Sequence, residues 1–85
     1  MYSLDEIKEN LLADFSKITN TTITDEESQM PLSALGIDSL QFVELLIETE
    51  ERYNFEFDDE KYFKDAFSSL EDIAKYSSEN QKILN

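Results

Sequence analysis

The sequence contains no cysteine and no histidine, and it has one glycine and one proline. Without cysteine there is no disulfide, no thiolate metal site and no cysteine nucleophile. Without histidine, a Ser-His-Asp triad and a histidine-containing zinc site are excluded as well. A single glycine leaves no glycine-rich phosphate loop, and the scarcity of turn residues argues against a turn-dense β architecture. The chain lacks acid–base machinery, and we predict that it is not an enzyme.

Basic residues are scarce too, because seven Lys and Arg stand against 20 Asp and Glu, a formal net charge of −13 at pH 7. Such an excess repels nucleic acids and anionic lipid headgroups, so we expect neither nucleic acid nor membrane as a partner. It attracts partners with basic surfaces, since opposite potentials speed encounter. The alternative, that the charge only keeps a small protein soluble, stays open on composition alone.

Long apolar runs are absent as well. No run approaches the roughly 20 residues that a membrane-spanning helix needs. The first twelve residues carry acids at positions 5, 6 and 9, so we do not expect a signal peptide. We therefore expect a cytoplasmic protein. The 85 residues allow one domain, residues 1–85, and 24 Leu, Ile, Val and Phe side chains supply a small core.

Apolar residues at three- and four-residue steps predict helices. Ser3 and Glu6 have the form of a capping box at the start of the first helix, and Asp38 with Gln41 has the same form at the start of the second. We predict an all-α fold, a small four-helix bundle with a long first loop and a short third helix. The expected helices cover about 3–18, 38–53, a short stretch within 58–67, and a segment that opens with the capping-box pattern Ser68–Glu71.

The second predicted helix has two apolar faces. Its core-facing stripe occupies an arc of about 100°. Leu40, Val43 and Ile47 lie in a separate arc of about 60°. Glutamates lie within or beside this arc: Glu44, Glu50 and Glu51. An apolar strip rimmed by carboxylates predicts a docking surface for a groove with a basic rim. The alternative is a central helix packed on all sides. The core-facing residues are Phe42, Leu45, Leu46, Thr49 and Tyr53.

Ser39 is the most informative single position. It would be the first residue of the second helix, just after a turn in which Gly36 can adopt a positive φ. A phosphate bonded to this serine would meet free backbone N–H groups and the positive end of the helix dipole. The chain has no histidine to activate Ser39 as a nucleophile, so we interpret it as an acceptor modified by another enzyme. The alternative is a helix-start serine with no role.

The string Leu35-Gly36-Ile37-Asp38-Ser39-Leu40, in an acidic chain of this length and helix pattern, resembles the acyl carrier proteins over nearly its whole length. The resemblance implies that a phosphopantetheinyl transferase attaches 4′-phosphopantetheine from coenzyme A to Ser39, with Asp38 and Leu40 flanking the arm. It implies that the thiol of the arm holds an acyl group as a thioester. The thiol that the sequence lacks then comes from the prosthetic group.

The same resemblance implies that the second helix is the element that partner enzymes recognise. Its partner-binding positions are Val43, Glu44, Ile47, Glu48 and Glu51. The partners implied are the transferase and acyl-loading and acyl-processing enzymes with basic docking surfaces, which act on a monomeric carrier in fatty acid, polyketide or related specialised biosynthesis. The interior would admit an acyl chain, lined by Leu45, Leu46, Phe63 and Ile73.

Some residues depart from the pattern of the family. Gln41 stands where many carriers of fatty acid synthesis have an acid, Phe42 is bulky, and the segment 55–67 is unusually aromatic. A fuller interior would shorten or reshape an acyl pocket. An aminoacyl or peptidyl carrier of a nonribosomal pathway is one alternative, although Leu35–Asp38 favours an acyl carrier. An acidic interaction protein is another.

A calcium or magnesium binder is a further alternative, suggested by two groups of acids: Asp58, Asp59 and Glu60, and the pair Glu50 and Glu51. The Asp-x-Asp-x-Asp-Gly spacing of an EF-hand is absent from the chain, and no glycine lies nearby to turn such a loop. We therefore expect no metal ligand set and no dedicated metal site.

Overall fold

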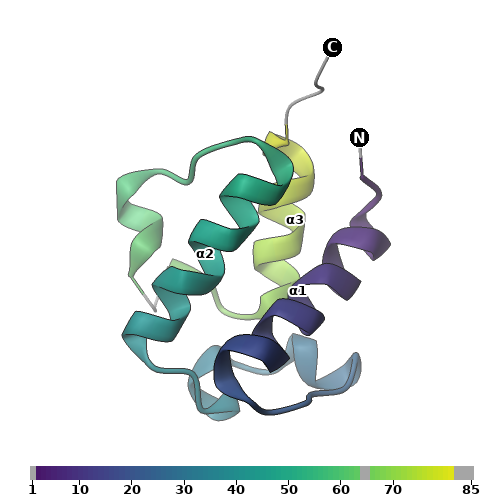
Figure 1. The fold of residues 1–85 in the computed structure, drawn as a ribbon, viewed down its shortest axis with the longest axis vertical. Helices are drawn as coiled ribbons and strands as arrows, with labels where there is room; N and C mark the ends of the chain where they lie inside the picture. The colour runs from purple at the N-terminus through teal and green to yellow at the C-terminus, as the bar shows by residue number, and fades with distance from the viewer. Residues whose placement is uncertain (1, 64–65, 82–85) are drawn as a thin grey trace.

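Three α-helices lie in the part of the chain that the structure describes, residues 2–63 and 66–81. In this computed structural model (Figure 1) each helix packs against the other two. The helices are α1 (Leu4–Thr19), α2 (Ser39–Tyr53) and α3 (Leu70–Asn80), with 3₁₀ helices at Glu26–Gln29, Leu32–Leu35 and Asp59–Tyr62. The described residues contain no strand, so the predicted all-α class is confirmed. None of the described helices is both long and apolar enough to cross a membrane.

The prediction of a four-helix bundle is not confirmed. Within its described residues, the segment expected to form the short third helix contains the 3₁₀ helix Asp59–Tyr62, after which Phe63 is extended at φ −95° and ψ 138°. Residues 64 and 65 of that segment lie outside the described residues. Aromatic side chains have modest helix propensity, so tertiary packing decides the backbone here. Phe57, just before this segment, and Phe67, at its end, are both buried, and their ring centroids lie 5.7 Å apart.

The helix starts follow the predicted capping residues, with one correction. The Ser3 side chain accepts a hydrogen bond from the Glu6 amide at the start of α1. At α3 the capping residue is Ser69, whose hydroxyl accepts from the amide of Asp72, so the helix begins one residue later than the pattern from Ser68 implied. The later start places Leu70 at an exposed fraction of 1%, in the core.

The predicted core-facing stripe of α2 is buried as expected. It packs against the apolar faces of α1 and α3, which also pack against each other. This burial of apolar side chains is the main force that holds so small a fold together. The buried residues are Phe42, Leu45, Leu46, Thr49 and Tyr53 on α2, Ile7, Leu11 and Phe15 on α1, and Leu70, Ile73 and Ala74 on α3.

Hydrogen bonds and a salt bridge join α1 to the C-terminal end of α2. Arg52 donates from Nη2 to both carboxylate oxygens of Asp14, at 3.0 and 3.2 Å. One residue further along α2, the Tyr53 hydroxyl accepts from the side-chain amide of Asn10 at 2.9 Å. Asp14 is buried, and a buried carboxylate needs such a partner. These bonds set the register of the two helices at this end.

Glu50 holds the segment between α2 and α3 in place. Its Oε2 atom accepts from the backbone amide of Phe57 at 2.7 Å and from the hydroxyl of Tyr62. Burial first, and then the bond to Glu50, raises the pKa of Tyr62 above its ordinary value of 10. The sequence suggested that Glu50 rims the outer strip of α2. The structure corrects this, because the carboxylate is half-buried and turned to the loop.

We expect Tyr62→Phe to lower the free energy of unfolding by about 1–3 kcal/mol, because it removes a hydrogen bond to a charged, half-buried group. Since the pKa of Tyr62 is raised in the folded state, its contribution is complete below pH 10 and declines as the pH rises above 10. Urea unfolding at neutral pH and above pH 10 measures both effects. Tyr2→Phe, at an exposed ring, is the control. Equal stabilities for the two variants would contradict the role of the bond.

Candidate functional site

Ser39 is the first residue of α2, and its side chain is exposed. The preceding residue, Asp38, caps the helix. Its carboxylate accepts from the Gln41 amide at 2.7 Å, and the Gln41 side chain accepts from the Asp38 amide at 3.1 Å. This confirms the predicted capping box. The amides of Ser39 and Leu40 lie in the first turn, where a helix offers no carbonyl partner and its dipole is positive.

Gly36 sets the direction of the chain into this helix start. Its backbone is left-handed, with φ 78° and ψ 14°, directly after the 3₁₀ helix Leu32–Leu35. The turn sends Ile37 into the core, at an exposed fraction of 1%, and leaves Asp38 and Ser39 at the surface. A Cβ added at Gly36 would meet no atom within 4 Å. The turn therefore needs the backbone freedom of glycine and not its small size.

This arrangement fits an arm attached through a phosphodiester. The Ser39 hydroxyl faces solvent, so a second enzyme can reach it. The first-turn amides beside it favour an anion. The neighbouring capping box keeps the helix start in place without using the Ser39 side chain. The chain contains no histidine that could take the proton of the Ser39 hydroxyl.

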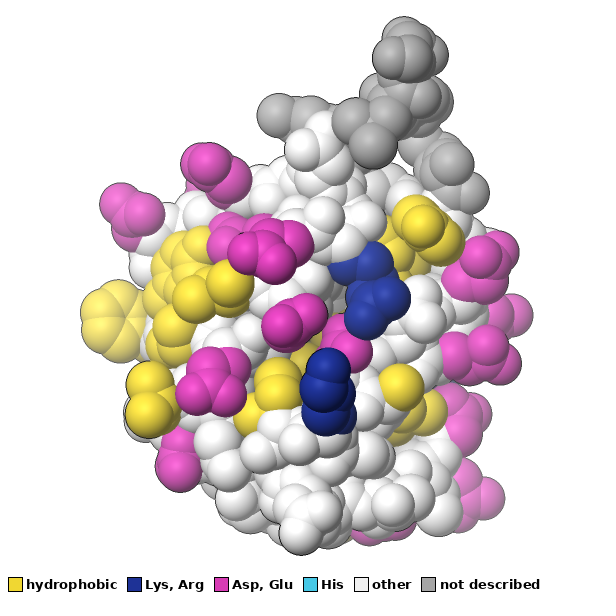
Figure 2. Space-filling model, in the orientation of Figure 1, with side chains coloured by type: hydrophobic (Ala, Val, Ile, Leu, Met, Phe, Trp, Pro, Cys, Tyr) yellow, Lys and Arg dark blue, Asp and Glu magenta, His cyan; other side chains and the backbone are white. Residues whose placement is uncertain are grey.

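The predicted outer strip of α2 lies at the surface. Leu40 is 70% exposed and Ile47 is 44% exposed, whereas Val43 is half-buried between them. The alternative of a helix packed on all sides is therefore wrong. Figure 2 shows Asp and Glu side chains spread across this face of the molecule and around an apolar patch at its left. The three glutamates of this side of α2 are all exposed. We define the outer face of α2 as six residues: Leu40, Val43, Glu44, Ile47, Glu48 and Glu51.

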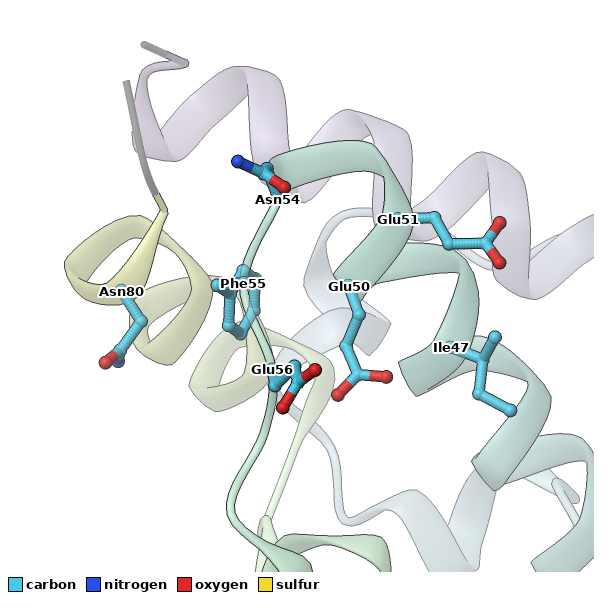
Figure 3. A pocket seen from close by; sticks show the side chains of 7 residues that line it. All are labelled: Ile47, Glu50, Glu51, Asn54, Phe55, Glu56 and Asn80. Carbon is cyan, nitrogen blue, oxygen red and sulfur yellow. The ribbon is translucent and has the colours of Figure 1, made fainter. Parts of the chain in front are cut away.

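Acid-lined hollows flank the outer face on both sides. One of about 320 Å³ lies toward α1, between Glu44 and Glu48 of α2 and Lys17 of α1. The other, of about 600 Å³, lies at the C-terminal end of α2 (Figure 3), where the carboxylates of Glu50 and Glu56 point into the same space. Within the described residues, no group of three or more acids is placed to hold a metal ion. Carboxylates spread in this way attract a basic surface.

The predicted lining of an acyl pocket is partly wrong. Leu45, Leu46 and Ile73 are in the core, but Phe63 is 71% exposed. The extended backbone at Phe63 turns its ring outward, and Phe67 occupies the interior instead. Periodicity along a helix could not indicate this, because no helix continues through Phe63. The many aromatic residues of the segment 55–67 indicated a fuller interior, but not which of the rings is buried.

Comparisons with known proteins match the chain along nearly all of its length. The family model described as the phosphopantetheine attachment site matches residues 9–77. An acyl carrier protein of Brachyspira hyodysenteriae (strain ATCC 49526 / WA1) is 34% identical over 87 aligned residues, which cover 96% of this chain and all of that protein. A second acyl carrier protein of the same species matches to the same extent. No solved structure matches the chain. The matched range includes Ser39.

Proposed function

Since this chain belongs to the acyl carrier proteins, which are carriers and not catalysts, we propose that Ser39 is the residue that bears its covalent 4′-phosphopantetheine. The observation that carries the proposal is the exposed hydroxyl at the first position of α2, beside free first-turn amides. The bound group supplies a terminal thiol on which an acyl group is held as a thioester. Asp38 fixes the helix start, and Leu40 places an exposed apolar side chain beside the arm.

Attachment needs a partner enzyme. The Ser39 oxygen forms a bond to the pantetheine-bearing phosphorus of coenzyme A and loses its proton, while adenosine 3′,5′-bisphosphate leaves. No histidine of this chain can accept that proton, so the phosphopantetheinyl transferase supplies the base.

Incubation of the unmodified protein with coenzyme A and a broad-specificity transferase, followed by intact mass, tests the proposal. We expect one added phosphopantetheine. No addition by a transferase that modifies another carrier in parallel would contradict it.

We further propose that the acyl groups belong to fatty acid, polyketide or related specialised biosynthesis. The named relatives are acyl carrier proteins, and this favours an acyl cargo over an aminoacyl or peptidyl one. The partners are the transferase and the enzymes that load and process the acyl group. Each would meet the outer face through a basic rim around an apolar groove, because opposite potentials steer encounter.

Reversing two charges of the outer face tests this docking. We expect Glu44→Lys/Glu48→Lys to slow modification by the transferase on the order of tenfold at low salt, because the rim charges steer association. The difference from wild type should shrink as salt is added. Initial rates by intact mass, at two ionic strengths, measure the effect, and circular dichroism checks the helical content.

The matched control carries the same change of charge away from the outer face. Glu9→Lys/Glu26→Lys alters exposed glutamates of α1 and of the first 3₁₀ helix. We expect it to slow the reaction far less. If the two double variants slow the transferase equally, net charge alone governs the rate and the outer face has no special role.

A further inference from the structure

We infer that an aromatic cluster closes the interior of this carrier, so that the acyl group stays outside the helices and is of a short or polar kind. The cluster consists of Phe42 on α2, Tyr76 on α3, and Phe57 and Phe67 between them. The inference rests on the proposed function, because it concerns the cargo of the arm on Ser39. It departs from the pocket that the family resemblance implies.

The burial of the core residues excludes open space around them. Phe42, Leu45, Leu46, Ile73 and Ala74 each have an exposed fraction of 0%. A side chain that borders a void wide enough for a water molecule keeps some accessible surface. No such void therefore touches these five residues, which lie on the facing sides of α2 and α3. An acyl chain could enter here only by displacing close-packed atoms.

The rings of the cluster contact one another in several directions. Phe57 stacks on Tyr76 at 5.2 Å and 19°, and it meets Phe67 edge-on at 5.7 Å and 79°. Phe67 also meets Tyr76 edge-on at 5.6 Å, and it lies 6.5 Å from Phe42. Aromatic rings are rigid plates that prefer these geometries. Opening a channel through the cluster would therefore move several rings together.

Polar contacts hold the outer edge of the cluster. The Tyr76 hydroxyl donates to the carboxylate of Asp58 at 3.3 Å. The Lys61 ammonium lies 5.6 Å from the ring centre of Phe67 and 5.7 Å from that of Tyr76, within the range of cation–π attraction. These contacts join the segment between α2 and α3 to the rings beneath it. The polar contacts therefore hold the edge of the cluster in place, in addition to the ring packing inside it.

A closed interior limits which acyl groups the carrier suits. A long hydrocarbon chain is stabilised when its apolar surface is removed from water, and the closed core has no space to bury it. At the surface, exposed apolar side chains such as Leu40, Ile47 and Phe63 are bordered by many carboxylates. Acyl groups with few methylene groups, or with hydroxyl, carboxyl or amino groups that water solvates, need no such cover. These are the cargo that the structure assigns to this carrier.

A series of acyl lengths tests the inference. Acetyl, butyryl, hexanoyl, octanoyl and decanoyl phosphopantetheine are attached from the corresponding coenzyme A esters, and intact mass confirms each product before use. We expect the Tm and the amide chemical shifts of Leu46, Ile73 and Ala74 to be independent of acyl length. An acyl group that is buried in the folded protein but exposed in the unfolded chain would stabilise the fold. The Tm would then rise as more of the group is buried. A Tm and core shifts that grow with each added pair of methylene groups would overturn the inference.

A second test needs no modification of Ser39, so it separates failure of this inference from failure of the proposed function. Engineered apolar cavities bind benzene, so benzene is the probe, with the amide shifts of the unmodified protein as readout. We expect no shift of the core amides in the wild type and binding in Phe67→Ala, or in the milder Phe67→Leu if the alanine variant does not fold. Phe63→Ala, at an exposed ring, is the control and should not bind. Benzene binding in the core of the wild type would overturn the inference, as would a folded Phe67 variant that binds none.

Discussion

Ser39→Ala is expected to abolish the addition of phosphopantetheine completely while leaving the helical content and the Tm close to those of the wild type. The substitution removes the oxygen that would accept the group. It leaves the capping box intact, because that box uses the side chains of Asp38 and Gln41. Alanine is a good helix former at an exposed position. Intact mass after incubation with coenzyme A and the transferase, with circular dichroism on the same sample, measures both expectations.

Ser33→Ala is the matched control for that loss. Ser33 is another exposed serine, in the 3₁₀ helix six residues before Ser39. We expect this variant to take up one phosphopantetheine at the rate of the wild type. Uptake by Ser39→Ala would show that a different hydroxyl is the acceptor. Loss of uptake in the Ser33 variant would show that the transferase depends on the turn before α2.

The second large effect is a contrast between two adjacent residues of α2. Leu46 is fully buried, whereas Ile47 is 44% exposed. We expect Leu46→Ala to lower the free energy of unfolding by about 2–5 kcal/mol, since it removes buried methyl groups and leaves a cavity. Ile47→Ala should lower it by less than about 1 kcal/mol, because much of the side chain is already in water. For a domain of this size the first loss is a large part of the total stability.

Urea unfolding of both variants measures the contrast, and partner binding should show the opposite order. Ile47→Ala removes an apolar side chain from the outer face, so we expect weaker binding to the transferase with the fold preserved. A loss of several kcal/mol in this variant would place Ile47 in the core and remove the basis for the outer face. If the wild type and Ile47→Ala bind the transferase equally well, only the acidic residues of the outer face contribute to docking.

The elements that could be predicted from the sequence are those fixed by neighbouring residues. The first helix, expected at about 3–18, is observed at Leu4–Thr19, and the second begins after Asp38 as expected. In both, the apolar period and the capping residues lie within a few positions of one another. The exposed position of Ser39 follows from the same local signals, because it depends only on where the helix starts.

The segment between α2 and α3 could not be predicted in this way. Its backbone follows from contacts with residues far along the chain, such as Phe57 with Tyr76 and Tyr62 with Glu50. No pattern within 58–67 indicates that Phe63 faces solvent while Phe67 is buried. Propensity is a weak guide where tertiary packing of aromatic side chains sets the conformation.

The open surroundings of Gly36 bear on how relatives of this protein are recognised. The position demands a positive φ but leaves room for a side chain, since an added Cβ would touch nothing within 4 Å. Asn20 and Asn54 of the same chain hold φ of 57° and 55°, so asparagine already serves this conformation twice. Asparagine is among the residues that enter the left-handed region most readily. A homologue with asparagine at position 36 would make the same turn, and a search that requires the glycine of Gly-x-Asp-Ser-Leu would overlook it.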